Sequence, residues 1–179
     1  MKTTAFALFI ALPVAAAVGP NTAVDNDTAP ASPARATFDR LATLTGTWTG
    51  RSTKGWVETV ELRVIAGGSV LLETSRFHDD PEGKNAMAST YQMDGEALLL
   101  THYCEAGNAP RLVASEFGDG GKTVTFTFRD GVNLPTRDRG HMDSMILRFE
   151  DDRHFDTRWT WYRDGKSSWM EDIRYERAR

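Results

Sequence analysis

The sequence contains a single cysteine, Cys104, among its 179 residues, so no disulfide can form within the chain. An exposed thiol is a liability in an oxidising compartment, and we therefore expect Cys104 to be buried. Without a disulfide, the fold must be held together by packing alone.

Motifs of several large enzyme classes are also missing. The sequence has no Gly-x-Ser-x-Gly, no phosphate-binding glycine loop, no His-Glu-x-x-His and no Cys-x-x-Cys. An excess of positive charge is absent as well, because 21 basic residues face 25 acidic ones, for a net charge of −4. This balance argues against a nucleic-acid partner, which favours a basic face.

No apolar run is long enough for a membrane helix, which needs about 20 residues. The run from Ala5 to Ala17 is shorter, follows Lys2 and ends in small residues, as a secretory signal peptide does. The sequence thus predicts a signal peptide (1–17), a flexible Ala- and Pro-rich linker (18–35) and one domain (36–179). We expect a periplasmic or secreted protein with no membrane span once the signal is removed.

Helical periodicity of the length found in βαβ units is absent from the domain, and the dominant period is two residues. Alternation of this kind is typical of half-buried strands. Pairs such as Asp94-Gly95 and Asp164-Gly165 supply the tight turns of antiparallel hairpins. About ten strands are predicted, at 46–53, 56–65, 69–77, 86–93, 96–104, 111–117, 122–129, 143–150, 153–163 and 167–176.

Ten antiparallel strands can close into a barrel or form a two-sheet sandwich. The meander of short turns favours the barrel, which leaves no exposed sheet edge. At 38–50, a short amphipathic helix leads into Gly46-Thr47-Trp48. This order resembles the start of lipocalin-like (calycin) barrels and implies a helix that closes one end and a Trp at the floor. The predicted fold is therefore an all-β, antiparallel, up-and-down closed barrel with a short N-terminal helix.

Segments 101–111, 133–135, 141–142 and 152–154 together resemble a group of secreted bacterial calycin-like barrels of unknown function. The resemblance covers most of the domain and implies the fold but no activity. Members carry His-x-His where this chain has His141-Met142-Asp143, so one metal ligand is missing. More remotely, the chain is similar to fatty-acid-binding and nitrobindin-type haem barrels. His154 is the one late-strand candidate for a haem ligand and lies beside a turn, so we expect neither haem nor another cofactor.

A ten-stranded barrel is wide enough to hold a cavity. The favoured interpretation is therefore a binding protein for a small apolar or amphipathic molecule, with no catalytic residues. Inward arginines would favour an anionic head group, because an unpaired buried guanidinium is costly. The candidate ligand-binding residues are Arg76, His102, Arg111, His141, Arg158, Trp159 and Trp161.

Two alternatives remain open on the sequence. One is an envelope protein-interaction module with a packed core and no cavity. The other is an enzyme in which the rim histidines His102, His141 and His154 act as acid–base groups or hold a metal.

Overall fold

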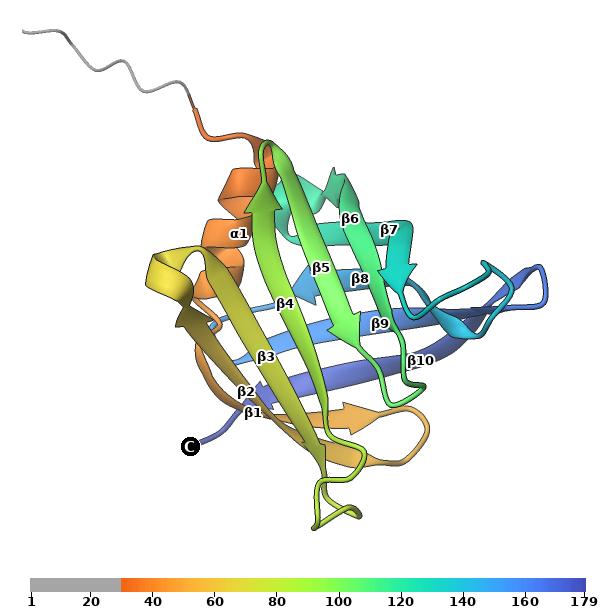
Figure 1. The fold of residues 1–179 in the computed structure, drawn as a ribbon. Helices are drawn as coiled ribbons and strands as arrows, with labels where there is room; N and C mark the ends of the chain where they lie inside the picture. Colours follow the sequence, from red (N-terminus) through yellow and green to blue (C-terminus); the bar gives the residue numbers. More distant parts are fainter. Residues whose placement is uncertain (1–29) are drawn as a thin grey trace, which may run out of the picture. The chain divides into compact units, whose positions relative to one another are not determined.

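A short helix precedes ten consecutive strands in the computed structural model, which describes residues 30–179 (Figure 1). Helix α1 spans Pro33–Ala42, so its first turn lies within the range predicted as linker. The predicted signal peptide and residues 18–29 of the linker lie outside the described residues. The strands are β1 (Gly46–Ser52), β2 (Val57–Ile65), β3 (Val70–Phe77), β4 (Met87–Asp94), β5 (Ala97–Tyr103), β6 (Ala109–Gly118), β7 (Thr123–Val132), β8 (His141–Phe149), β9 (His154–Arg163) and β10 (Lys166–Arg177).

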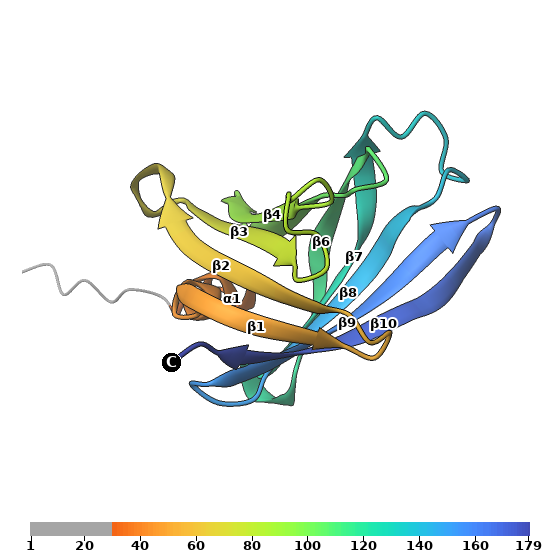
Figure 2. The ribbon, with the colours of Figure 1, turned by 90° about the horizontal axis from the view of Figure 1, so that it is seen from below.

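Every strand pairs antiparallel with its neighbours in sequence, and β1 also pairs with β10, which closes the barrel. Trp48 of β1 lies at this closure, where it is paired with Val60 of β2 on one side and with Arg177 of β10 on the other. Figure 2 shows β1 lying beside β10. The predicted ten-stranded up-and-down barrel is confirmed, and the sandwich is excluded.

Helix α1 packs against β4, β5 and β6 at one end of the barrel. Ser32 caps its first turn by accepting a hydrogen bond from the amide of Arg35 at 3.3 Å, and Pro33 occupies the first turn, where no amide donor is needed. Phe38 and Leu41 point from the helix into the core and are almost fully buried. The helix is too short to be stable alone, so this buried face holds it in place. Within residues 30–179, no helix has the length and apolar character needed to cross a bilayer.

Trp48 forms the floor of the barrel beside this helix. Its indole Nε1 donates a 2.7 Å hydrogen bond to the Leu44 carbonyl oxygen, and its ring meets Phe155 edge to face at 4.8 Å. The Arg177 guanidinium lies 4.3 Å from the centre of the indole and also donates to the Thr45 carbonyl oxygen. The helix and the Trp therefore close one end, as the sequence predicted.

Large apolar side chains fill the half of the barrel next to α1. They come from most of the strands, which is why no single segment determines how tightly the interior is packed. Because this packed layer holds the strands together at the α1 end, the opposite end can remain open. The layer includes Leu62, Leu71, Leu100, Leu112, Phe126, Met145, Leu147 and Phe149.

Strands β8 and β10 each carry a bulge near the opposite end of the barrel. The register shifts between Met142 and Ser144 in β8 and between Trp169 and Glu171 in β10. A bulge bends a strand and re-aims the side chains around it. Met142, Trp169 and Glu171 all line the cavity described next.

Candidate functional site

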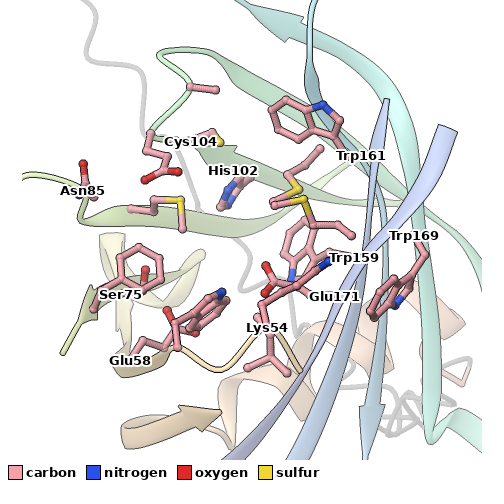
Figure 3. A pocket seen from close by; sticks show the side chains of 18 of the residues that line it. Lys54, Glu58, Ser75, Asn85, His102, Cys104, Trp159, Trp161, Trp169 and Glu171 are labelled. Carbon is pink, nitrogen blue, oxygen red and sulfur yellow. The ribbon is translucent and has the colours of Figure 1, made fainter. Parts of the chain in front are cut away.

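A cavity of about 800 Å³ opens at the end of the barrel opposite α1 (Figure 3). It lies among the β1–β2, β3–β4, β5–β6 and β9–β10 connections and the strand residues next to them. Small-molecule sites have volumes of roughly 300–1,000 Å³, so the space is large enough for a ligand of that class.

Aromatic and thioether side chains make up much of the wall. Trp159 and Trp161 lie on β9, and Trp169 lies on β10, so these three form one side of the cavity (Figure 3). Trp56 meets the ring of Phe77 edge to face at 5.1 Å. Four of the five tryptophans in the chain thus surround the opening. The remaining apolar lining is Met87, Ala106, Met142, Met170 and Ile173.

Glu58 is the most deeply buried acid of the cavity, with only 3% of its surface exposed. Its Oε1 accepts a 2.8 Å hydrogen bond from the Tyr175 hydroxyl. Burial raises the pKa of Glu58 to about 7, and the nearby charges of Glu73 and Glu171 add to the increase. Gly50 leaves room for this pair, because a Cβ there would come within 2.7 Å of the tyrosine ring and 2.9 Å of the Glu58 side chain.

Glu73 and Glu171 line the same cavity, as does the exposed Glu105 of the β5–β6 connection. Glu73 Oε2 accepts from the Tyr91 hydroxyl at 3.0 Å, and Glu171 Oε2 accepts from the Ser52 hydroxyl at 2.5 Å. Burial raises the pKa of both carboxyl groups, although these hydrogen bonds oppose the increase. The cavity wall therefore carries buried or half-buried acidic side chains from β2, β3 and β10.

His102 lies in the cavity wall on β5 with 5% of its surface exposed. Its Nδ1 is 3.1 Å from the Ser89 hydroxyl, and its ring centre is 5.1 Å from that of Trp159. Burial lowers the pKa of His102 to about 4, so the imidazole is neutral near pH 7. Its Nε2 is buried and has no hydrogen-bond partner. The cavity thus contains a polar atom that a ligand could satisfy.

Cys104 also lines the cavity, but it is half-buried rather than fully buried as predicted. Burial raises the pKa of its thiol, which keeps the sulfur protonated and weakly nucleophilic. Among the described residues, no hydrogen bond joins this thiol to His102. The two residues therefore do not form a nucleophile–base pair.

The three candidate arginines point away from the cavity, so the expectation that they face inward is wrong. Arg111 is 45% exposed and forms a bidentate ion pair with Asp130, at 2.5 and 2.7 Å. Arg158 is paired in the same way with Asp172, at 2.7 and 2.9 Å. Arg76 is exposed on β3. Each lies on the outer face because its sequence neighbours occupy the inner one, and the basis for an anionic head group is removed.

His141 is fully buried but does not line the cavity. It packs against Phe128 and Tyr162, with ring centres 4.6 and 5.5 Å away. Arg137, from the connection between β7 and β8, lies over the same two rings and donates to His141 Nε2 and to Asp143. The loop thus covers this histidine and gives it a structural role.

The histidines do not converge on a metal or catalytic centre. His154 lies at the β8–β9 turn, where its Nδ1 is 2.9 Å from Asp151 Oδ1. Within residues 30–179, no three His, Cys, Asp or Glu side chains are grouped in a way that could hold a metal ion. Of the seven candidate residues, the structure places His102, Trp159 and Trp161 in the cavity wall.

The sequence interpretation did not identify the acids of the cavity, although strand alternation marks two of them. Glu58 is in phase with the apolar positions Val60 and Leu62, and Glu171 is in phase with Ile173 and Tyr175. An acidic residue at an inward position of a strand marks a buried carboxyl group. Strand phase could therefore have identified Glu58 and Glu171.

No protein-family model and no curated protein matches this chain. A solved structure to which it is similar is a protein of unknown function from the DUF3598 family of Nostoc punctiforme, at 12% identity and a TM-score of 0.47. The likeness covers 77% of this chain and 49% of the other, so this chain spans about half the length of that protein. The resemblance to calycin-like secreted proteins is not confirmed by these comparisons.

Proposed function

We propose that this chain is an exported β-barrel protein that binds a small apolar or amphipathic molecule inside its barrel. The cavity of about 800 Å³ is the observation that carries the proposal. Protein interiors are normally close-packed, with few voids larger than a water molecule. An unfilled space of this size destabilises a fold. Its presence therefore supports ligand binding over an interaction module with a solid core.

The chemistry of the wall supports the same function. Small-molecule sites combine apolar and aromatic surface with a few placed polar groups. Here Trp159 and Trp161 supply flat apolar surface, and His102 Nε2 supplies an unpaired polar atom. Leaving a buried polar atom unpaired costs about 1–3 kcal/mol, and a bound hydrogen-bonding group would remove that cost.

Export is part of the proposal because of the apolar N-terminal run and the small residues that end it. The mature protein isolated from its own cells should begin after Ala17. N-terminal sequencing tests this, and a mature protein that retains Met1-Lys2 in the cytoplasm would contradict export while leaving the cavity untouched.

Native mass spectrometry of the protein purified from its own source tests ligand binding. We expect a population heavier than the polypeptide by the mass of one small molecule, which is lost on denaturation. A neutral dye, Nile red, provides a second assay, because its fluorescence rises in apolar surroundings.

A matched pair of variants tests whether the dye binds inside the cavity. Ser75 lines the cavity and Thr74 lies next to it on the opposite face of β3. Ser75→Phe should reduce Nile red binding at least tenfold, and Thr74→Phe should leave it unchanged, with circular dichroism confirming that both variants are folded. Equal binding by the two variants would show that the dye does not occupy the cavity and would count against the proposal.

A further inference from the structure

The buried polar groups of the cavity share one property, which is that they carry no positive charge. Glu58 and Glu171 are 3% and 4% exposed, and Glu73 is a half-buried residue of β3 in the same cavity wall. None of these three carboxyl groups forms an ion pair within residues 30–179. His102, the buried nitrogen base of the site, is neutral.

The two basic residues at the cavity lie at its mouth. Lys54 and Arg163 are both exposed, and the Lys54 ammonium lies 4.8 Å from the centre of the Trp169 ring. Figure 3 shows Lys54 between Glu58 and Trp169, close to Glu171. The charge of Lys54 acts on Glu171, whereas Glu58 and Glu73 lack a counter-charge supplied by the chain.

A buried carboxylate without a counter-charge is costly, and a bound cation relieves that cost. The raised pKa values of Glu58, Glu73 and Glu171 have this physical origin. Tryptophan faces also attract cations, and Trp159 and Trp161 line the cavity on the side away from Glu58 (Figure 3). His102 Nε2, buried and unpaired, independently indicates that the interior is built to meet a polar group.

We propose that the ligand is a protonated amine carried on an apolar or aromatic body, with its ammonium group beside Glu58 and Glu73 and its body against the tryptophans. This inference rests on the proposed function, since it assigns a charge to the molecule that the same cavity binds. An ammonium group has three donors and suits several acceptors at once. A carboxylate ligand would instead be repelled by the three acids.

Three probes with one aromatic body test the charge. These are 2-naphthylmethylamine, 2-naphthalenemethanol and 2-naphthoate, which are cationic, neutral and anionic at pH 7.5. Isothermal titration calorimetry should give an amine affinity at least tenfold above that of the alcohol, with naphthoate the weakest. An alcohol or naphthoate that binds as tightly as the amine would overturn the inference.

Two variants of β2 locate the effect. Glu58→Gln removes the charge but keeps an oxygen for the Tyr175 hydroxyl, and Glu61→Gln removes a charge from the outer face of the same strand. We expect Glu58→Gln to weaken amine binding about tenfold without changing alcohol binding, and Glu61→Gln to change neither. An amine affinity unaffected by Glu58→Gln would overturn the placement of the ammonium group.

Nile red separates this inference from the function on which it rests. If Nile red occupies the cavity but the amine has no advantage over the alcohol, the charge assignment fails and the binding function stands. If neither Nile red nor any naphthyl probe binds, the binding function itself fails.

Discussion

Replacement of Glu58 by glutamine should stabilise this protein in a way that depends on pH. The carboxyl group is buried, and its pKa is about 7 in the folded state against 4.5 for an ordinary glutamate. Between these two values the folded chain holds a proton that the unfolded chain releases. Raising the pH therefore favours unfolding, and the wild-type protein loses stability from about pH 4.5 up through pH 7.

The size of the effect follows from the pKa difference. One pKa unit corresponds to about 1.4 kcal/mol, so the free energy of unfolding should fall by about 3 kcal/mol once the pH is well above 7. Glutamine resembles the protonated acid in shape and cannot ionise. Glu58→Gln should therefore match the wild type near pH 4.5 and exceed it by about 3 kcal/mol at pH 8.5.

Urea unfolding followed by tryptophan fluorescence measures both proteins at the two pH values. The other titrating groups around Glu58, namely Glu73, Glu171 and Tyr175, are present in both proteins, so their contributions largely cancel in the difference. The control is Glu61→Gln, since Glu61 is 54% exposed and faces Arg63 at 3.5 Å on the outer surface. We expect the control to change stability by less than about 1 kcal/mol at either pH. A stabilisation by Glu58→Gln that is the same at both pH values, or a loss of stability at pH 8.5, would refute the reasoning.

Three further outcomes can be checked in the same way. The pKa of His102 is about 4 in the fold against 6.5 in an unfolded chain, so acid favours unfolding; His102→Leu should remove a stability loss of about 3 kcal/mol between pH 7 and pH 4 in urea titrations. Trp48→Phe deletes the hydrogen bond to the Leu44 carbonyl and leaves space at the floor, which should lower stability by about 2 kcal/mol and reduce Tm in calorimetry. Arg111→Ala breaks an exposed pair with Asp130 and should shift the midpoint of urea unfolding little without changing Nile red affinity; a large loss of dye binding would contradict its outward position.

Much of the architecture could be predicted from the sequence. Strand periodicity and Asp-Gly turns are local properties of the chain, and all ten predicted strands form. The segment from Phe38 to Gly50 also folds as predicted, because the helix has an apolar face and Trp48 follows at the first strand. Closure follows from the need to pair two long sheet edges.

The directions of the polar side chains were harder to predict. In β3, apolar residues occur in both phases, with Leu71 and Phe77 facing inward but Val70 and Leu72 on the other face, so alternation alone does not place Arg76. Pairing with β2 and β4 determines which face of β3 points into the barrel. For Arg158 the sequence was sufficient, because it alternates with the inward Trp159 and must face outward.

His141 shows a second limit of strand patterns. Its place on β8 is local, but its burial depends on Arg137 and the loop before the strand, which fold back over Phe128 and Tyr162. The cation–π contacts and hydrogen bonds that hold this loop join residues from three strands and one connection. Such an arrangement exists only after the barrel has formed.

By itself, the amino-acid sequence determined that this chain forms a closed antiparallel barrel with a helix and Trp48 at one end, because periodicity, turns and capping act over a few residues. Only the tertiary structure decided that the other end is hollow, and that Glu58, Glu73 and Glu171 line it while Arg76, Arg111 and Arg158 lie outside. The empty volume is what remains after side chains from ten strands are packed together. No single segment of the sequence determines this empty volume, so it can be seen only when all ten strands are in place.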